Sequence, residues 1–104
     1  MDPRVAGFDW NDANRDKCRK HGVSVAAIES LFQRPIAVFP DPAHSRGETR
    51  FKAIGKTEEG RGVFIVFTLR TRAGETLIRP ISARYMHAKE MKHYEKEAAE
   101  IPKR

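Results

Sequence analysis

The sequence predicts an α+β fold: a small antiparallel sheet of about four strands, with two N-terminal helices and one C-terminal helix. A change of hydrophobic period is the first observation that predicts it. Apolar residues follow helical spacing up to residue 34, whereas the middle of the chain reads as short strands joined by turns. The second observation is length, because 104 residues suffice for one modest core. We therefore expect a single domain over residues 1–104.

The N-terminal third is expected to contain a short strand and two helices. Phe-Asp-Trp at residues 8–10 is the strand candidate. Asn11 or Asp12 can cap a helix that continues to His21, since both side chains accept hydrogen bonds from the free N–H groups of a first turn. Ser24 can cap a second helix. The apolar stripe of that helix has helical spacing and consists of Val25, Ile28, Leu31 and Phe32.

Three strands are expected in the middle of the chain. Residues 36–39 form a short apolar strand, and residues 49–56 alternate imperfectly between apolar and cationic side chains. Residues 63–69 are continuously apolar. A strand of that kind is typical of the centre of a sheet, so we expect it to be covered on both faces.

The last strand and the last helix are expected to follow one another directly. Residues 75–82 read as the strand, which contains Pro80. Proline has no N–H to donate to a ladder, so it indicates an edge position or a bulge. The helix is predicted to start near Ser82 and to run toward Glu100.

Positive charge gathers in the second half of the chain. The formal net charge is +6, of which residues 61–104 contribute +5, with ten Lys and Arg against five Asp and Glu. Every cation of residues 61–84 is arginine, whose planar fork matches the oxygens of a phosphate. Nucleic acid is the leading candidate partner. A solvated basic face that holds an acidic protein is the alternative.

Three arginines form the best candidate site. Arg79 lies among apolar residues, and Arg84 lies at the predicted helix start, where the helix dipole disfavours a cation. A tight hairpin is expected to place Arg70 and Arg79 roughly opposite each other, where like charges repel. An RNA phosphate would relieve this repulsion. Alternatively Glu48, Glu75 or a C-terminal glutamate neutralises the arginines as ion pairs.

RNA cleavage also needs groups that move protons. The available proton carriers are His44, Glu48, His87 and Tyr94. The predicted catalytic set is Arg70, Arg79, Arg84, Glu48 and His44. Further cations are expected to bind RNA, namely Arg50, Lys52, Arg72 and His87. The four histidines show no metal-binding spacing and the chain has one cysteine, so we expect neither a metal nor another cofactor.

Several short motifs occur in a characteristic order. They are Phe8-Asp9-Trp10, Lys-His-Gly-Val-Ser at 20–24, the region 41–51, Ile-Arg-Pro-Ile-Ser-Ala-Arg at 78–84, and Tyr94-Glu95. Together these motifs resemble the BrnT family, toxins of bacterial type II toxin–antitoxin pairs. The resemblance covers roughly residues 7–97.

The resemblance implies a RelE-like fold and metal-independent RNA cleavage that blocks translation, on free RNA or on the ribosome. It implies a BrnA-like antitoxin with a ribbon-helix-helix domain, through which alone the complex would bind operator DNA. In the wider RelE-like group basic residues on the sheet carry the chemistry, and Arg79 and Arg84 match such positions. The alternative function is a non-catalytic module that binds nucleic acid or a partner protein. The N-terminus lacks the apolar stretch of a signal peptide and no run could span a bilayer, so we expect a cytoplasmic protein without membrane contact.

Overall fold

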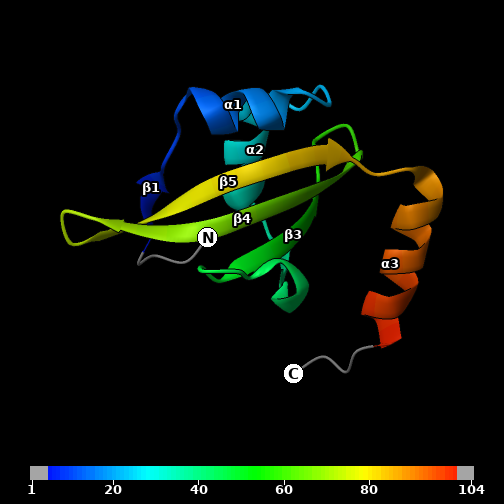
Figure 1. Ribbon diagram of the computed structural model, residues 1–104. Helices are drawn as coiled ribbons and strands as arrows, with labels where there is room; N and C mark the ends of the chain where they lie inside the picture. Colours follow the sequence, from blue (N-terminus) through cyan, green and yellow to red (C-terminus); the bar gives the residue numbers. More distant parts are fainter. Residues whose placement is uncertain (1–4, 101–104) are drawn as a thin grey trace.

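The computed structural model describes residues 5–100, and the side chains of these except His44 and residues 97–100. Its elements are β1 (Val5–Phe8), α1 (Asp12–Arg19), α2 (Val25–Phe32), β2 (Ala37–Pro40), the 3₁₀ turn η1 (Pro42–His44), β3 (Arg50–Lys56), β4 (Gly62–Arg72), β5 (Glu75–Tyr85) and α3 (Ala88–Glu100). The strands form one sheet in the order β1-β5-β4-β3-β2 (Figure 1). The predicted α+β class is confirmed.

The sheet is mixed, because β1 pairs with β5 in the parallel direction, with Phe8 beside Ile78. The other three pairings are antiparallel. The prediction of about four antiparallel strands is therefore wrong at this edge, where a fifth strand is added in the other direction. Two helices and three strands separate β1 from β5 in the chain, and no local sequence signal reports a pairing over that separation.

The hairpin of β4 and β5 is longer than predicted. Each strand has 11 residues, and only Ala73 and Gly74 turn the chain, with φ of 52° and 79°. Positive φ at both central residues matches the twist of the paired strands. Of the two positions expected for Pro80, an edge or a bulge, the structure has the bulge: the register shifts between Val66 and Phe67, and Phe67 faces Pro80.

Both N-terminal helices begin where their capping residues predicted. The Asn11 Oδ1 accepts a hydrogen bond from the Asn14 N–H at 3.1 Å, and the Asn14 Oδ1 accepts one from the Asn11 N–H at 2.7 Å. The Ser24 Oγ likewise accepts one from the N–H three residues further on. These contacts satisfy donors that a helix N-terminus otherwise leaves free. Helix α1 ends at Arg19, slightly before the predicted His21.

The last helix begins later than predicted. Strand β5 continues to Tyr85, and α3 begins at Ala88 rather than near Ser82. The intervening residues stay extended because they pair with β4, as Arg84 does with Phe64. Backbone hydrogen bonds between β5 and β4 outweigh the local helix preference of these residues. Arg84 therefore lies on a strand, and the expected conflict between its charge and a helix dipole does not exist.

Helices cover one face of the sheet. Ile28, Leu31 and Phe32 of α2 are buried against it, together with Ile65 and Phe67 of β4. Figure 1 shows α2 behind the sheet and α3 standing beside one end of it. On the other face none of the three α-helices of residues 5–100 lies over the centre, and Phe64 and Val66 are only half-buried. The prediction that the central strand is covered on both faces is thus wrong.

Two tight contacts connect the layers. An added Cβ at Gly55 of β3 would lie 2.8 Å from the Ile36 Cγ2 and 3.1 Å from the Leu31 Cδ2. Glycine therefore lets α2 and the loop between α2 and β2, which contains Ile36, lie close to β3. Met91 of α3 packs directly on Gly62, where an added Cβ would overlap the Met91 side chain.

Within residues 5–100, the helices are too short or too polar to cross a membrane.

Candidate functional site

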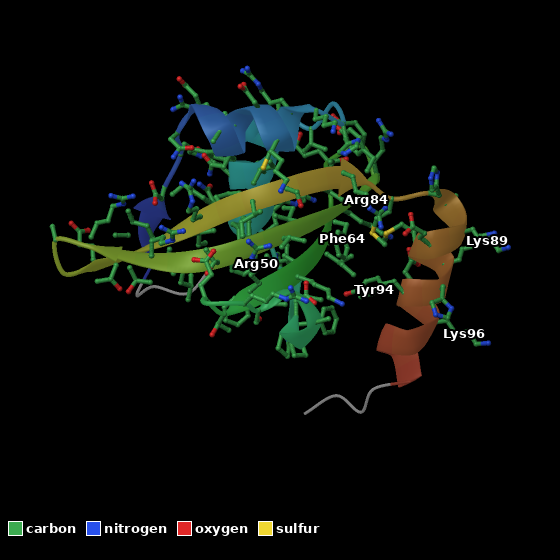
Figure 2. The ribbon with its side chains drawn as sticks, viewed as in Figure 1. Arg50, Phe64, Arg84, Lys89, Tyr94 and Lys96 are labelled. Carbon is green, nitrogen blue, oxygen red and sulfur yellow. The ribbon has the colours of Figure 1, made fainter. Side chains whose placement is uncertain are left out.

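The face of the sheet opposite α2, here called the open face, brings most predicted site residues together. The register of β3, β4 and β5 aligns three rows of side chains across it: Arg50–Thr68–Arg79, Lys52–Val66–Ser82 and Ile54–Phe64–Arg84. Paired residues share a face, as do residues two apart along a strand, so Arg70 joins them. Five predicted cations therefore project from one surface, and Figure 2 shows Arg50, Phe64 and Arg84 on it.

Arg70 and Arg79 are not opposite each other, as the sequence had suggested. Arg70 pairs with Leu77, and Arg79 pairs with Thr68. The hairpin turns at Ala73 and Gly74, which shifts the register by two residues relative to the expected one. The two arginines are diagonal neighbours, and each has a carboxylate partner of its own.

Glu48 lies between two arginines of the open face. Its Oε2 is 3.1 Å from the Arg70 Nη2, and its Oε1 is 3.9 Å from the Arg50 Nη2. All three side chains are partly accessible, with 31% of Glu48, 32% of Arg50 and 41% of Arg70 exposed. The Nε atoms of Arg50 and Arg70 are buried and have no hydrogen-bond partner among the described residues. The group can therefore offer a carboxylate and two guanidiniums that are partly accessible to solvent.

Arg79 is held at the start of α1. Its Nη1 is 3.7 Å from the Asp9 Oδ2 and donates a long 3.5 Å hydrogen bond to the Asp9 carbonyl. Its Nη2 donates to the Asn11 Oδ1 at 3.4 Å. Only 15% of the Arg79 side chain and 11% of the Asp9 side chain are exposed. Arg72 binds the same Asp9 oxygen through Nε and Nη2, at 3.2 and 3.1 Å. Arg79 therefore ties the end of β1 to β5.

Arg84 forms a two-pronged pair with Glu90 in the first turn of α3. The Nη1 and Nη2 atoms of Arg84 donate to the Glu90 Oε1 and Oε2 at 2.9 and 3.0 Å. The His87 N–H donates to the same Oε1 at 3.0 Å. The hydrogen bonds from Arg84 and from the His87 N–H lower the pKa of Glu90 to about 2, and the bond to Glu90 raises the pKa of Arg84. The Arg84 guanidinium also lies 4.9 Å from the centre of the Phe64 ring.

A shallow hollow of about 270 Å³ lies at the centre of the open face. Phe64, Val66 and Ile81 supply its apolar lining. Lys17 and Lys52 supply positive charge, and the Lys52 Nζ is 3.9 Å from the buried carboxylate of Asp41. An apolar floor with a basic rim suits a nucleobase and its phosphates.

Sequence reasoning missed Lys17, Asp41 and Phe64 as site residues. For Phe64 a signal existed, because it lies an even number of positions from Arg70 on one strand. For Lys17 and Asp41 no such signal existed, because other elements bring them to the sheet.

Of the predicted site residues, Arg50 and Lys52 line this hollow, whereas Glu48, Arg70, Arg79 and Arg84 do not. Three further predicted site residues lie at the ends of strands or have side chains outside the described residues. Arg72 lies at the hairpin end, on Asp9. His87 lies between β5 and α3 and is exposed. His44 ends η1, and its side chain lies outside the described residues. The predicted roles of all nine site residues remain predictions.

The described residues contain no cluster of three His, Cys, Asp or Glu side chains that could hold a metal ion. Each arginine of the predicted catalytic set has a carboxylate within 4 Å: Arg70 has Glu48, Arg79 has Asp9 and Arg84 has Glu90. Ion pairing, the alternative considered from the sequence, is thus present at each arginine.

A family profile described as "Ribonuclease toxin, BrnT, of type II toxin-antitoxin system" matches residues 10–90. The chain belongs to the BrnT family of ribonuclease toxins. The match extends from the approach to α1 into the first turn of α3, so it includes every predicted site residue, from His44 to His87. No individual curated protein matches the chain.

Membership of the BrnT family confirms the resemblance carried by the short motifs. A ribonuclease toxin of a type II system acts on RNA and has an antitoxin as its partner. The open face brings five of the predicted cations together, and such a surface suits a polyanion. The family description does not specify which residues cut RNA.

Proposed function

We propose that this toxin is an endoribonuclease that binds RNA on the open face and cuts it without a metal ion, thereby blocking translation. The observation that carries the proposal is the position of Glu48 between Arg50 and Arg70, on a face with three further cations. A carboxylate can accept a proton, and the adjacent guanidiniums can stabilise the charge that develops on phosphate.

The reaction proposed is attack of an RNA 2′-hydroxyl on the adjacent phosphorus. The O2′–P bond forms and the P–O5′ bond breaks, which leaves a 2′,3′-cyclic phosphate and a 5′-hydroxyl end. Glu48 accepts the proton of the 2′-hydroxyl, and His44 is the candidate acid that protonates the leaving oxygen. Arg70 and Arg50 bind the phosphate, with Arg84 and Lys52 beside them. Arg79 adds positive potential from a more enclosed position.

The partner is proposed to be a BrnA-like ribbon-helix-helix antitoxin. The family description supports an antitoxin, and the motif resemblance supports its type. The toxin–antitoxin complex would then bind operator DNA through the antitoxin and repress its own operon. We place the toxin in the cytoplasm, where its RNA substrate is translated.

The test is incubation of purified toxin with RNA in EDTA, with and without ribosomes, followed by analysis of the new ends. Cyclic phosphate ends formed in EDTA are the expected result. Glu48→Gln should slow cleavage by about 10²- to 10⁴-fold, and Arg70→Ala should also slow it. Arg19→Ala is the matched control, since Arg19 is an exposed arginine of α1, and it should cleave like the parent.

Two results would overturn the proposal. RNA that is bound but stays intact under all conditions would support the non-catalytic binding module instead. Cleavage that requires added magnesium and leaves 5′-phosphate ends would refute the metal-independent mechanism.

A further inference from the structure

An apolar groove lies on the helix-covered face of the sheet, opposite the open face. Its volume is about 400 Å³, within the range of roughly 300–1,000 Å³ in which proteins hold apolar groups. Each of the five strands contributes a side chain to it: Val5, Ile78, Leu69, Phe51 and Val38. With strands about 4.8 Å apart, it crosses roughly 19 Å of sheet.

The groove is open because α2 is short compared with the sheet it covers. Helix α2 has eight residues, about 12 Å of helix, whereas β4 has 11 residues, about 36 Å of strand. Beyond Phe32, where α2 ends, the apolar side chains of the sheet continue without a helix over them. Figure 1 shows the hairpin extending past α2.

The groove contains the most exposed apolar side chains of the described chain. Among residues 5–100, the large hydrophobic residues with high exposure are Val38 at 50% and Leu69 at 43%, and both line this groove. Val38 lies on β2 and Leu69 lies on β4, with β3 between these strands, and both side chains line the same groove. A contiguous apolar patch of this kind is typical of a protein interface.

The charge of the groove indicates the chemistry of its occupant. Arg34 is its charged residue, and the other lining residues are apolar. RNA is a polyanion, and the five cations of the open face suit it better than the single lining arginine of this groove does. An apolar protein segment that also carries a carboxylate would fill the groove and pair with Arg34.

We infer that this groove is a docking site for the antitoxin, which inserts a segment of several aliphatic or aromatic side chains with an acidic residue facing Arg34. The inference requires the antitoxin partner but not the proposed RNA chemistry. The groove and the open face lie on opposite sides of the sheet. The groove therefore supplies binding affinity, and the open face is left to RNA or to another part of the antitoxin.

The experiment measures binding of the toxin to the antitoxin encoded by its partner gene, for the parent and for Leu69→Glu and Val38→Glu. Both positions are half-exposed, so the variants should melt within a few degrees of the parent. A buried charge in place of an interface anchor should weaken binding about 30-fold or more. Ala26→Glu is the control: it adds the same charge on exposed α2 surface outside the groove, and it should bind like the parent.

Arg34→Glu provides a second, independent variant. It should weaken binding more at low salt than at high salt, since it reverses a charge pair. Growth arrest by Leu69→Glu should persist but should no longer be relieved by the antitoxin.

Antitoxin affinity equal to that of the parent in folded Leu69→Glu and Val38→Glu would overturn the inference. So would parent toxin that forms a dimer which Leu69→Glu dissociates, because a second copy would then occupy the groove. The experiment measures antitoxin binding, whereas the proposed function is tested by RNA cleavage. A groove that does not bind the antitoxin can therefore be distinguished from a toxin that does not cleave RNA.

Discussion

At the scale of single residues, the arginines of the open face differ mainly in how far they are enclosed. Arg79 is 15% exposed and joins β5 to Asp9, whereas Arg70 and Arg84 are each 41% exposed. Glu48 pairs with both Arg50 and Arg70 and is partly accessible to solvent. An incoming phosphate can therefore replace the Glu48 carboxylate as the partner of these two arginines. Arg79 thus supports the fold more than its neighbours do, and Arg70 is better placed to act on substrate.

Arg79→Ala should therefore cost more stability than Arg70→Ala. Removal of Arg79 leaves Asp9 largely buried with one fewer partner, which typically costs about 1–3 kcal/mol. Arg70 forms a surface pair, which is typically worth about 0–1 kcal/mol. Denaturant unfolding of both variants and the parent measures the difference. Equal losses, or a larger loss for Arg70→Ala, would show that Asp9 does not depend on Arg79.

At the scale of elements, α3 is attached to the sheet by a small number of specific contacts. Met91 packs on Gly62, and the Tyr94 ring lies 6.3 Å from that of Phe39. Figure 2 shows Tyr94 pointing from α3 toward the sheet, while Lys89 and Lys96 point away. At the start of α3 the Arg84–Glu90 pair joins β5 to the helix. The position of α3 therefore depends in part on an ion pair.

Acid should loosen this attachment through Glu90. Its pKa is lowered from 4.5 to about 2, mainly by the hydrogen bonds from Arg84. A carboxyl with a lowered pKa in the folded state stabilises the protein fully above its ordinary pKa, and this stabilisation is lost as the pH falls from about 4.5 to about 2. Glu90→Gln should thus lower Tm at neutral pH, and its difference from the parent should vanish near pH 2.

Thermal melts across this pH range give the measurement. Glu58→Gln, in the exposed turn between β3 and β4, is the matched control and should follow the parent at every pH. A Tm difference for Glu90→Gln that does not change with pH would show that the carboxylate charge is not what holds α3.

At the scale of the whole molecule, two different surfaces lie on the two sides of one sheet. The open face concentrates cations in a chain of net charge +6. The helix-covered face leaves an apolar groove beyond α2. If both proposals hold, opposite chemistry on opposite faces would let a small toxin bind a polyanion and an apolar protein segment on separate surfaces.

RNA binding should be strongly dependent on salt. For a single strand, the logarithm of affinity falls with the logarithm of salt concentration with a slope of about −0.7 per phosphate contacted. Three to five contacts on the open face would give a slope of about −2 to −3.5. Fluorescence anisotropy of a labelled RNA with the Glu48→Gln toxin, titrated at several salt concentrations, measures the slope.

Lys52→Ala should reduce that slope by about 0.7, because one phosphate contact is lost. Arg19→Ala should leave the slope unchanged, since Arg19 is an exposed residue of α1 that does not line the hollow. A slope near zero for the Glu48→Gln toxin that serves as the reference would contradict phosphate binding by this surface.

The sequence by itself determined the features that depend on neighbouring residues. Asn11 or Asp12 for the first helix, and Ser24 for the second, could be named as candidate caps because a cap acts on N–H groups two or three residues away. Pro80 indicated an edge position or a bulge because it lacks a ladder donor. The α+β class followed from the change of hydrophobic period, and the BrnT family followed from short motifs in their order.

Only the tertiary structure decided which distant residues meet. The pattern along a strand reports which residues share a face, but it reports neither the strand's neighbour nor its direction. The parallel pairing of β1 therefore could not be predicted, nor could the place of Asp9 beside Arg79. Arg84 illustrates the same limit: its local sequence reads as a helix start, yet pairing with β4 keeps it on a strand and sets it against Glu90. Contacts between elements depend on packing of the whole chain, which no local window contains.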